Sequence, residues 1–139
     1  GLVQGGHATQ ADMDTAVELF SAVGKTYVMS ENMLDALTAV SGCGPAFVYQ
    51  IIEALADGGV EKGLPRSVAQ ELAAQTVMGA GKMVLESGRH PGQLKDSVCS
   101  PGGSTIAGVH VMEQRAVRGA VMDAVDAAYE KMLEVGRKA

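Results

Sequence analysis

The chain of 139 residues is 47% hydrophobic with a mean hydropathy of +0.12, which is typical of one globular domain that buries about two-thirds of its surface. Its formal net charge of −5 and its lack of a basic run argue against a nucleic-acid-binding protein. No apolar run reaches the length that we expect of a membrane span. Cys43 and Cys99 show neither metal-ligand nor disulfide-scaffold spacing, which indicates a reducing compartment.

Residues 1–30 predict the end of an α/β domain. Residues 1–10 are glycine-rich and weakly strand-like, residues 12–23 have the apolar spacing of a helix, and residues 25–29 are β-prone. Gly24 suits the position after that helix. The segment holds no Gly-x-Gly-x-x-Gly turn in a strand–helix setting. We therefore expect the part of such a domain that binds a dinucleotide to lie outside this sequence.

From Ser30 onward the pattern is helical, with prolines at helix starts and glycines after helix ends. The predicted helices cover about residues 31–40, 45–62, 66–87, 104–113 and 116–136, with a further short helix that begins at Pro91. This succession predicts a mainly α fold for most of the chain.

The predicted helix at residues 66–87 is apolar around much of its girth. It contains Gly79 and Gly81, each of which costs a helix about 1 kcal/mol. Both glycines are explained if another backbone passes close by, and a second copy of the chain would supply the surface that the helix faces. A central helix in a monomeric bundle would also explain the pattern, so the residues alone leave both arrangements open.

Residues 100–105, Ser-Pro-Gly-Gly-Ser-Thr, form the stretch around which the rest is organised. Pro101 fixes one backbone angle, and the two glycines after it permit a left-handed turn and a close backbone approach. Ser104 and Thr105 occupy the expected N-cap of the next helix. Free N–H groups and hydroxyls at a helix N-terminus suit a small anion such as a carboxylate or phosphate. An ordinary turn with a cap has the same sequence signature.

The other polar residues predict no second site. His7, His90 and His110 lie far apart, without a cysteine or carboxylate at ligand spacing, so we expect no metal. His90 suits the start of a helix. Arg115 and Arg118 could form an anion patch, but exposed surface charge is their expected role.

A series of motifs in the same order resembles those of pyrroline-5-carboxylate reductases, and the resemblance covers most of the chain. The first motif looks like the family's Ser-Gly-x-Gly-Pro-Ala turn, and the last is the loop with its flanking residues. The matching residues are 41–46, 54–60, 63–65, 81–83 and 90–94, followed by 98–100, Gly102, Gly103, Thr105, Gly108, Val109, Met112 and Glu113.

This resemblance implies a Rossmann-type dinucleotide-binding domain, of which residues 1–30 are the last remnant, followed by an all-helical dimerisation and substrate-binding domain at residues 31–139. The expected fold is therefore mainly α, a helical bundle that forms an intertwined homodimer, with higher homo-oligomers also compatible. The expected location is the cytoplasm, or else the mitochondrion. Neither nucleic acid nor a membrane is an expected partner.

The resemblance also implies reduction of 1-pyrroline-5-carboxylate to L-proline by NADPH or NADH, the last step of proline biosynthesis. The absence of a nucleophile or acid–base pair fits such hydride transfer, in which the cofactor supplies the reactivity. The implied substrate-binding residues are Ser100, Gly102, Gly103, Ser104 and Thr105. Of these, Thr105 is also the catalytic residue, with its hydroxyl near the imine. Val98 and Cys99 are carried over as walls of the nicotinamide site. Other members often have Ala or Thr at position 104, a change that a backbone donor survives.

Two alternatives stay open. The chain could be a non-catalytic helical oligomerisation module, since it holds no complete cofactor fold. It could also belong to a different imine or 3-hydroxyacid reductase of similar plan, which the Ser-Pro-Gly-Gly-Ser-Thr loop argues against. Whether the enzyme is a pyrroline-5-carboxylate reductase or such a different reductase, we expect this chain alone to be inactive.

Overall fold

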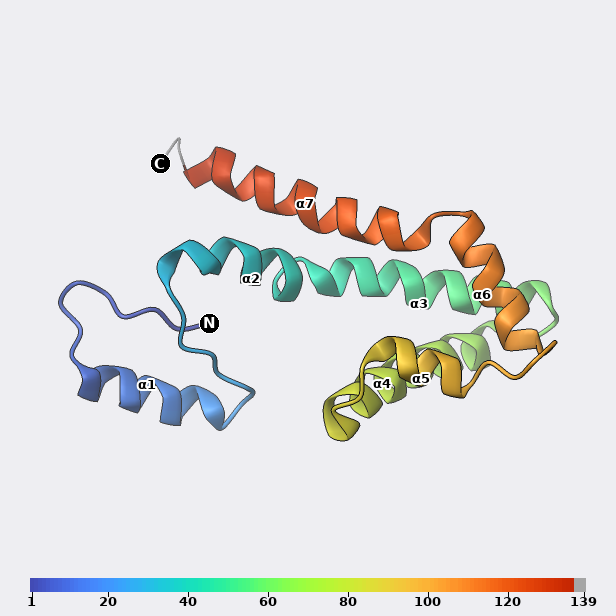
Figure 1. Cartoon of the computed structure of the whole chain (residues 1–139), viewed down its shortest axis with the longest axis horizontal. Helices are drawn as coiled ribbons and strands as arrows, with labels where there is room; N and C mark the ends of the chain where they lie inside the picture. The colour runs from blue at the N-terminus through green and yellow to red at the C-terminus, as the bar shows by residue number, and fades with distance from the viewer. Residues whose placement is uncertain (137–139) are drawn as a thin grey trace. The chain divides into compact units, whose positions relative to one another are not determined.

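The computed structural model describes residues 1–136, and α-helices make up nearly all of their regular structure (Figure 1). The elements are α1 Gln10–Ser21, the 3-10 helix η1 Glu31–Met33, α2 Leu34–Ser41, α3 Gly44–Glu61, α4 Arg66–Ser87, α5 Pro91–Ser97, α6 Ser104–Gln114 and α7 Val117–Gly136. The mainly α prediction is confirmed. The last three residues of the predicted domain 31–139 lie outside the described residues.

The chain packs as two compact units, which are described one at a time. The first comprises Gly1–Gly44 with Val125–Ala139, and the second comprises Pro45–Ala124. These are units of packing, and the domain boundary near residue 30 stays a prediction.

In the first unit, α1 begins at a capping box. The Thr9 hydroxyl oxygen accepts a hydrogen bond from the Asp12 N–H at 3.3 Å, and the Asp12 carboxylate accepts one from the Thr9 N–H at 2.7 Å. The hydrogen bonds from Thr9 hold the pKa of the exposed Asp12 carboxyl below its usual value. The helix therefore starts two residues earlier than predicted. It also ends two residues earlier, at Ser21, and beyond it the Val23 and Gly24 N–H groups both donate to the Phe20 carbonyl, each at 3.1 Å.

The two predicted strands that flank α1 do not form among the described residues. A single parallel bridge joins Leu2 to Val28. The Leu2 N–H donates to the Tyr27 carbonyl at 2.8 Å, and the Met29 N–H donates to the Leu2 carbonyl at 3.0 Å. The two segments run parallel, as in a strand–helix–strand unit, but two short segments without further strands rarely hold a longer ladder.

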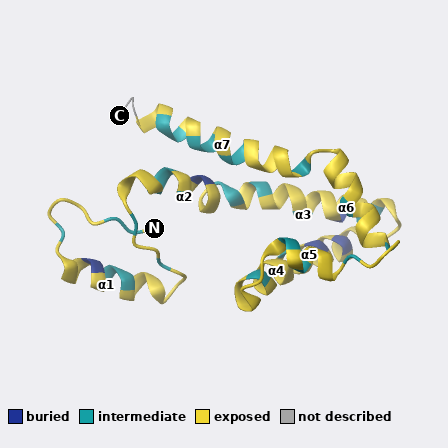
Figure 2. Ribbon diagram, viewed as in Figure 1, coloured by how far each residue is buried: buried dark blue, intermediate teal, exposed yellow. Residues whose placement is uncertain are grey.

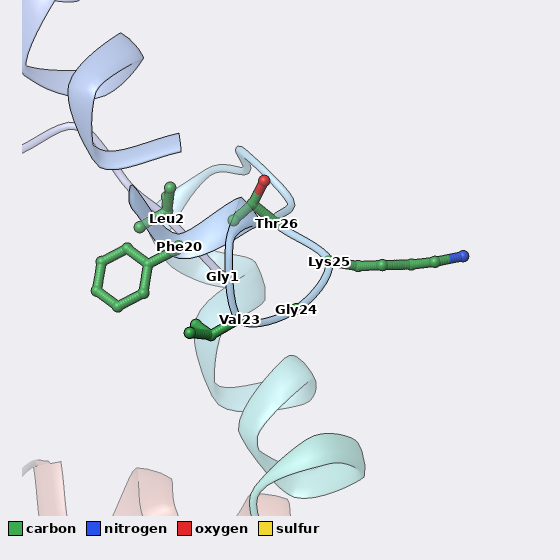
Figure 3. A pocket seen from close by; sticks show the side chains of 7 residues that line it. All are labelled: Gly1, Leu2, Phe20, Val23, Gly24, Lys25 and Thr26. Atoms are coloured by element: carbon green, nitrogen blue, oxygen red, sulfur yellow. The ribbon is translucent and has the colours of Figure 1, made fainter. Parts of the chain in front are cut away.

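Apolar side chains remain exposed beside this bridge. Phe20 is 55% exposed and Val23 is 84% exposed. Figure 3 shows Leu2, Phe20 and Val23 turned to the same side at a hollow of about 240 Å³, whereas the Lys25 side chain points away. Burial of these side chains against another surface would be favourable.

In the second unit, α3 and α4 form a helical hairpin around a core of small residues. Ala56, Ala69 and Ala73 are buried, and Ile52 and Val60 pack against them. Because alanine side chains are short, the two helices can approach closely along this line. The core of the hairpin is consequently narrow and leaves the larger apolar side chains outside it.

The turn between α3 and α4 depends on Gly63, whose φ of +98° lies in the left-handed region that favours glycine. The Arg66 guanidinium contacts the Asp57 carboxylate across this turn. Both side chains are at least half exposed, so the ion pair contributes little to stability. The predicted helix end near residue 62 is confirmed to within one residue.

The boundaries between α4 and α5 also agree with the prediction. Gly88, with φ +63°, ends α4, and its N–H donates to the Val84 carbonyl at 3.2 Å. Pro91 opens α5, with His90 as the N-cap. Proline is well placed there, because the first N–H of a helix has no intrahelical partner to lose.

Most large apolar side chains of the second unit are exposed. Figure 2 marks exposed residues in yellow along α3 and α4. Within the described residues, no atom lies within 4 Å of where a Cβ would stand on Gly79 or Gly81. The exposed residues of α3 and α4 include Val48, Tyr49, Ile51, Leu55, Val68, Leu72, Met78, Met83 and Leu85.

One stretch is long and apolar enough to cross a membrane by length and composition, contrary to the expectation that none would be. It covers Glu31–Glu61, where η1, α2 and α3 follow one another. Core helices of soluble proteins pass the same test, and Gly42 and Cys43 interrupt the helix within the stretch. Its apolar character therefore adds to the exposed surface of α3 rather than defining a membrane protein.

Candidate functional site

The loop between α5 and α6 begins with a tight turn over residues 100–103. The Gly103 N–H donates to the Ser100 carbonyl at 3.0 Å. Pro101 occupies the second position, and Gly102 occupies the third with φ +68°. This combination of proline and left-handed glycine is that of a type II turn. The prediction that a glycine here supplies a positive φ is confirmed.

Gly103 is required for a different reason, the close approach of the backbone. A Cβ at this position would lie 2.4 Å from the Ser100 Oγ and 3.1 Å from the Ser100 carbonyl oxygen. Its own backbone is extended, with φ −76° and ψ 167°, so no left-handed conformation is involved. Gly102 thus supplies the predicted positive φ, and Gly103 supplies the predicted close approach of the backbone.

The N-cap of α6 is Gly103, and not Ser104 or Thr105 as predicted. The turn already places Gly103 in the extended conformation of an N-cap, so the helix begins one residue earlier than a side-chain cap would require. Gly103 makes no side-chain cap hydrogen bond. The N–H groups of Ser104, Thr105 and Ile106 therefore point out of the first turn without an intrahelical partner.

The Ser104 and Thr105 side chains are exposed, and neither hydroxyl hydrogen-bonds to any other described residue. Three free N–H groups and two free hydroxyls thus lie together at the positive end of the α6 dipole. This arrangement can hold a small anion through backbone donors and can still offer a hydroxyl to a neighbouring atom.

Val98 and Cys99 connect α5 to this turn. Val98 is the C-cap of α5 and is 63% exposed, whereas Cys99 is half-buried and its N–H donates to the Asp96 carbonyl at 3.1 Å. Val98 also borders a groove of about 460 Å³ between the end of α4 and α5. The other residues that line this groove are Ala80, Met83, Val84, Arg89, Pro91, Leu94, Lys95 and Ser97.

Lys95 is a charged neighbour of the loop that the sequence did not single out. Its Nζ lies 2.6 Å from the Asp96 Oδ1. Asp96, and to a smaller extent Cys99 and Glu113, raise the pKa of the Lys95 ammonium above its usual value. The lysine therefore stays cationic. Its position in a short helix, three residues before Val98, is the sequence signal that could have identified it as a neighbour of the loop.

The residues considered for other roles lie elsewhere. Arg115 borders a separate groove together with residues of α3 and α7, and Arg118 is exposed on α7. Over residues 1–136, no group of three or more His, Cys, Asp or Glu side chains gathers in a way that could hold a metal ion.

The fold and the loop together define a class: a helical domain with large exposed apolar faces and an open helix N-terminus suited to an anionic ligand. The chain belongs to the pyrroline-5-carboxylate reductase dimerisation family, whose family model matches residues 31–135.

Individual relatives agree with this assignment. The chain is 51% identical over 138 residues to the pyrroline-5-carboxylate reductase of Methanosarcina acetivorans, which covers 99% of this chain and 51% of that protein. The crystal structure of Plasmodium falciparum pyrroline carboxylate reductase with NADP bound matches with a TM-score of 0.85 and 39% identity, over 91% of this chain and 51% of that one. The pyrroline-5-carboxylate reductase of Coxiella burnetii matches with a TM-score of 0.90 and 33% identity, over 96% and 50%. The chain thus spans about half the length of these relatives.

Proposed function

We propose that this chain is part of a pyrroline-5-carboxylate reductase, an oxidoreductase that reduces 1-pyrroline-5-carboxylate to L-proline with NADPH or NADH. In this proposal residues 31–139 supply the dimer interface and the substrate loop, and residues 1–30 complete a preceding dinucleotide-binding domain. The observation that carries the proposal is 51% identity, over 99% of the chain, to a protein of that name. The relatives include archaeal and cyanobacterial proteins, in keeping with a cytoplasmic location.

The loop residues have separate tasks in this reaction. The substrate is a cyclic imine that carries a carboxylate, and an anion of that size suits the free N–H groups at the start of α6. The proposed carboxylate contacts are Ser100, Gly102, Gly103 and Ser104. The Thr105 hydroxyl, at the second residue of α6 and without another partner, is proposed to hydrogen-bond the imine nitrogen and to align the C=N bond.

The cofactor, when bound, supplies the hydride. Most of its contacts are proposed to lie in the preceding domain, because the described residues include no dinucleotide-binding fingerprint. Val98 and Cys99 are the proposed contacts within this chain. The exposed apolar side chain of Val98 next to the turn suits the face of a nicotinamide ring. The NADP in the Plasmodium falciparum structure supports a pyridine nucleotide of this kind.

A homodimer is proposed because most large apolar side chains of α3 and α4 are exposed in the single chain. Obligate dimers bury more than about 2,000 Å² and have apolar interfaces. The open space over Gly79 and Gly81 in α4 is where a partner backbone could approach. The dimerisation family that matches residues 31–135 supports the same arrangement.

Replacement of Met78 by glutamate should dissociate this dimer or make it aggregate. Met78 lies on α4 and is 61% exposed in the single chain, so a monomer would tolerate the charge. In a dimer the same charge would be buried without a partner, at a cost of several kcal/mol. The control is Gln75→Glu, which introduces the same charge at an exposed polar position of the same helix. Sedimentation equilibrium at micromolar concentration should show a dimer for the wild type and the control, and a stable folded wild-type monomer would contradict the proposal.

The reductase proposal predicts proline formation by the protein that joins this chain to the predicted preceding domain, and none by this chain alone. The assay follows oxidation of NADPH and NADH with 1-pyrroline-5-carboxylate, together with proline production. The expected difference is complete, because residues 1–30 cannot hold a dinucleotide by themselves. A longer protein that dimerises but neither binds a pyridine nucleotide nor forms proline would leave the non-catalytic oligomerisation module as the better interpretation.

A further inference from the structure

His90 closes the start of α5 with its ring. Its backbone is extended, with φ −60° and ψ 135°, and the ring Nδ1 accepts a hydrogen bond from the Gly92 N–H at 3.1 Å. A Cβ at Gly92 would lie 3.0 Å from that same Nδ1. Glycine at this position therefore leaves room for the ring to sit directly over the helix end.

This single cap matters because α5 is only seven residues long. Pro91 has no N–H, so the Gly92 N–H is the first donor of the helix that needs a partner. The next two N–H groups, of Gln93 and Leu94, both donate to the His90 carbonyl, at 2.9 and 3.2 Å. All three hydrogen bonds that form the first turn thus end on one residue.

The other end of α5 leads directly into the loop. The Val98 N–H donates to the Lys95 carbonyl at 3.2 Å and the Cys99 N–H donates to the Asp96 carbonyl at 3.1 Å. The turn that begins at Ser100 follows at once. A loosened first turn would leave about one helical turn of α5 to hold these residues in place, and so short a helix is marginal on its own.

The cap requires a neutral imidazole. A ring nitrogen accepts a hydrogen bond only when it carries no proton, and an imidazolium donates from both nitrogens. A positive charge at a helix N-terminus is also opposed by the helix dipole. The cap therefore needs the tautomer in which Nδ1 carries no proton and Nε2 carries it.

We propose that His90 is a positioning residue for the substrate loop, and that its neutral ring, through the cap on Gly92, holds α5 so that residues 98–105 keep their geometry. This inference rests on the proposed reductase function. His90 touches neither the proposed substrate nor the proposed cofactor contacts.

The kinetic test compares His90→Asn with the wild type in the longer protein that carries the predicted cofactor domain. Asparagine is a strong N-cap, so its side chain can accept from the Gly92 N–H in place of the ring. The kcat/KM of this variant should stay within about twofold of that of the wild type.

Two further variants complete the comparison. His90→Ala should give kcat/KM about three- to fivefold below that of His90→Asn, since alanine cannot cap. His7→Ala, at an exposed histidine of the first unit, should keep the kcat/KM of the wild type. Equal kcat/KM in His90→Ala and His90→Asn would overturn the positioning role.

A spectroscopic test reads the cap without any activity. In this chain, nitrogen NMR of the His90 ring at pH 8 should show an unprotonated Nδ1 and a protonated Nε2. Exchange of the Gly92 amide should be several-fold slower in the wild type and His90→Asn than in His90→Ala. A protonated Nδ1 at pH 8 would overturn the cap even if the protein is a reductase, whereas a confirmed cap in an inactive longer protein would overturn only the proposed function and the role built on it.

Discussion

Replacing Thr105 by alanine is expected to lower kcat/KM of the proposed reductase about ten- to a hundredfold. Loss of one hydrogen bond to a bound ligand costs about 1–3 kcal/mol, and each 1.36 kcal/mol is a factor of ten in rate. Thr105 lies at the second residue of α6, beside N–H groups that have no partner in the helix, and its own hydroxyl is free. Removing that hydroxyl takes away a ligand contact without taking away a contact within the chain.

Stability measurements distinguish this role from helix capping. If Thr105 capped α6, alanine would lower the melting temperature and leave the kinetics near normal. The structure assigns the N-cap to Gly103, so the melting temperature of Thr105→Ala should stay close to that of the wild type.

Thr105→Ser is the matched control, because it keeps the hydroxyl and removes only a methyl group. It should retain most of the activity. Wild-type kcat/KM in the alanine variant would defeat the assignment of Thr105, and equal losses in both variants would point to the methyl group instead.

Gly103→Ala is expected to have a larger effect, about a hundredfold or more in kcat/KM. The new Cβ would meet the Ser100 Oγ at 2.4 Å, which the hydroxyl can relieve by rotating, and the Ser100 carbonyl oxygen at 3.1 Å, which is backbone and cannot rotate away. The backbone of the turn must therefore shift, by a few tenths of an ångström at least, and the N–H groups proposed to hold the substrate shift with it. Displacements of about 1 Å in a catalytic arrangement can cost a hundredfold in rate.

Gly119→Ala is the control for this substitution. Gly119 lies inside α7, and no described atom stands within 4 Å of a Cβ there. Alanine is a better helix former than glycine by about 1 kcal/mol, so this variant should be active and at least as stable as the wild type. Steady-state kinetics and thermal melts of both variants provide the comparison. Undiminished activity in Gly103→Ala would show that the turn does not hold the substrate.

Local signals predicted the helix boundaries well. Gly88 and Pro91 mark the end of α4 and the start of α5 because a left-handed glycine and a fixed proline φ act within a few residues. The start of α1 is also encoded locally, since Thr9 and Asp12 have the spacing of a capping box, whereas the apolar periodicity alone places the start two residues later. The N-cap of α6 was harder, because the preceding turn determines which residue is extended.

Features that depend on distant parts of the chain were predicted less well. The β-prone residues 25–29 form one bridge and no strand, because a strand needs neighbours that these residues do not have among those described. The close approach in the loop, between Ser100 and Gly103, agrees with the prediction because it spans only four residues. The roles of Thr105, Val98 and Cys99 came from resemblance to a family, and geometry alone does not assign a ligand to them.

Because the apolar side chains of α3 and α4 are exposed, the stability of each subunit of the proposed dimer depends on its partner. Leu55, Leu72 and Met78 are each at least half exposed in the single chain, so the folded state gains stability from association and loses it on dilution. A cell that makes two forms of this chain would pair them with each other as readily as with themselves. A substitution on α3 or α4 would then destabilise the unaltered copies that it captures, and its effect would be dominant, whereas a substitution such as Thr105→Ala would leave the folding of its partner intact.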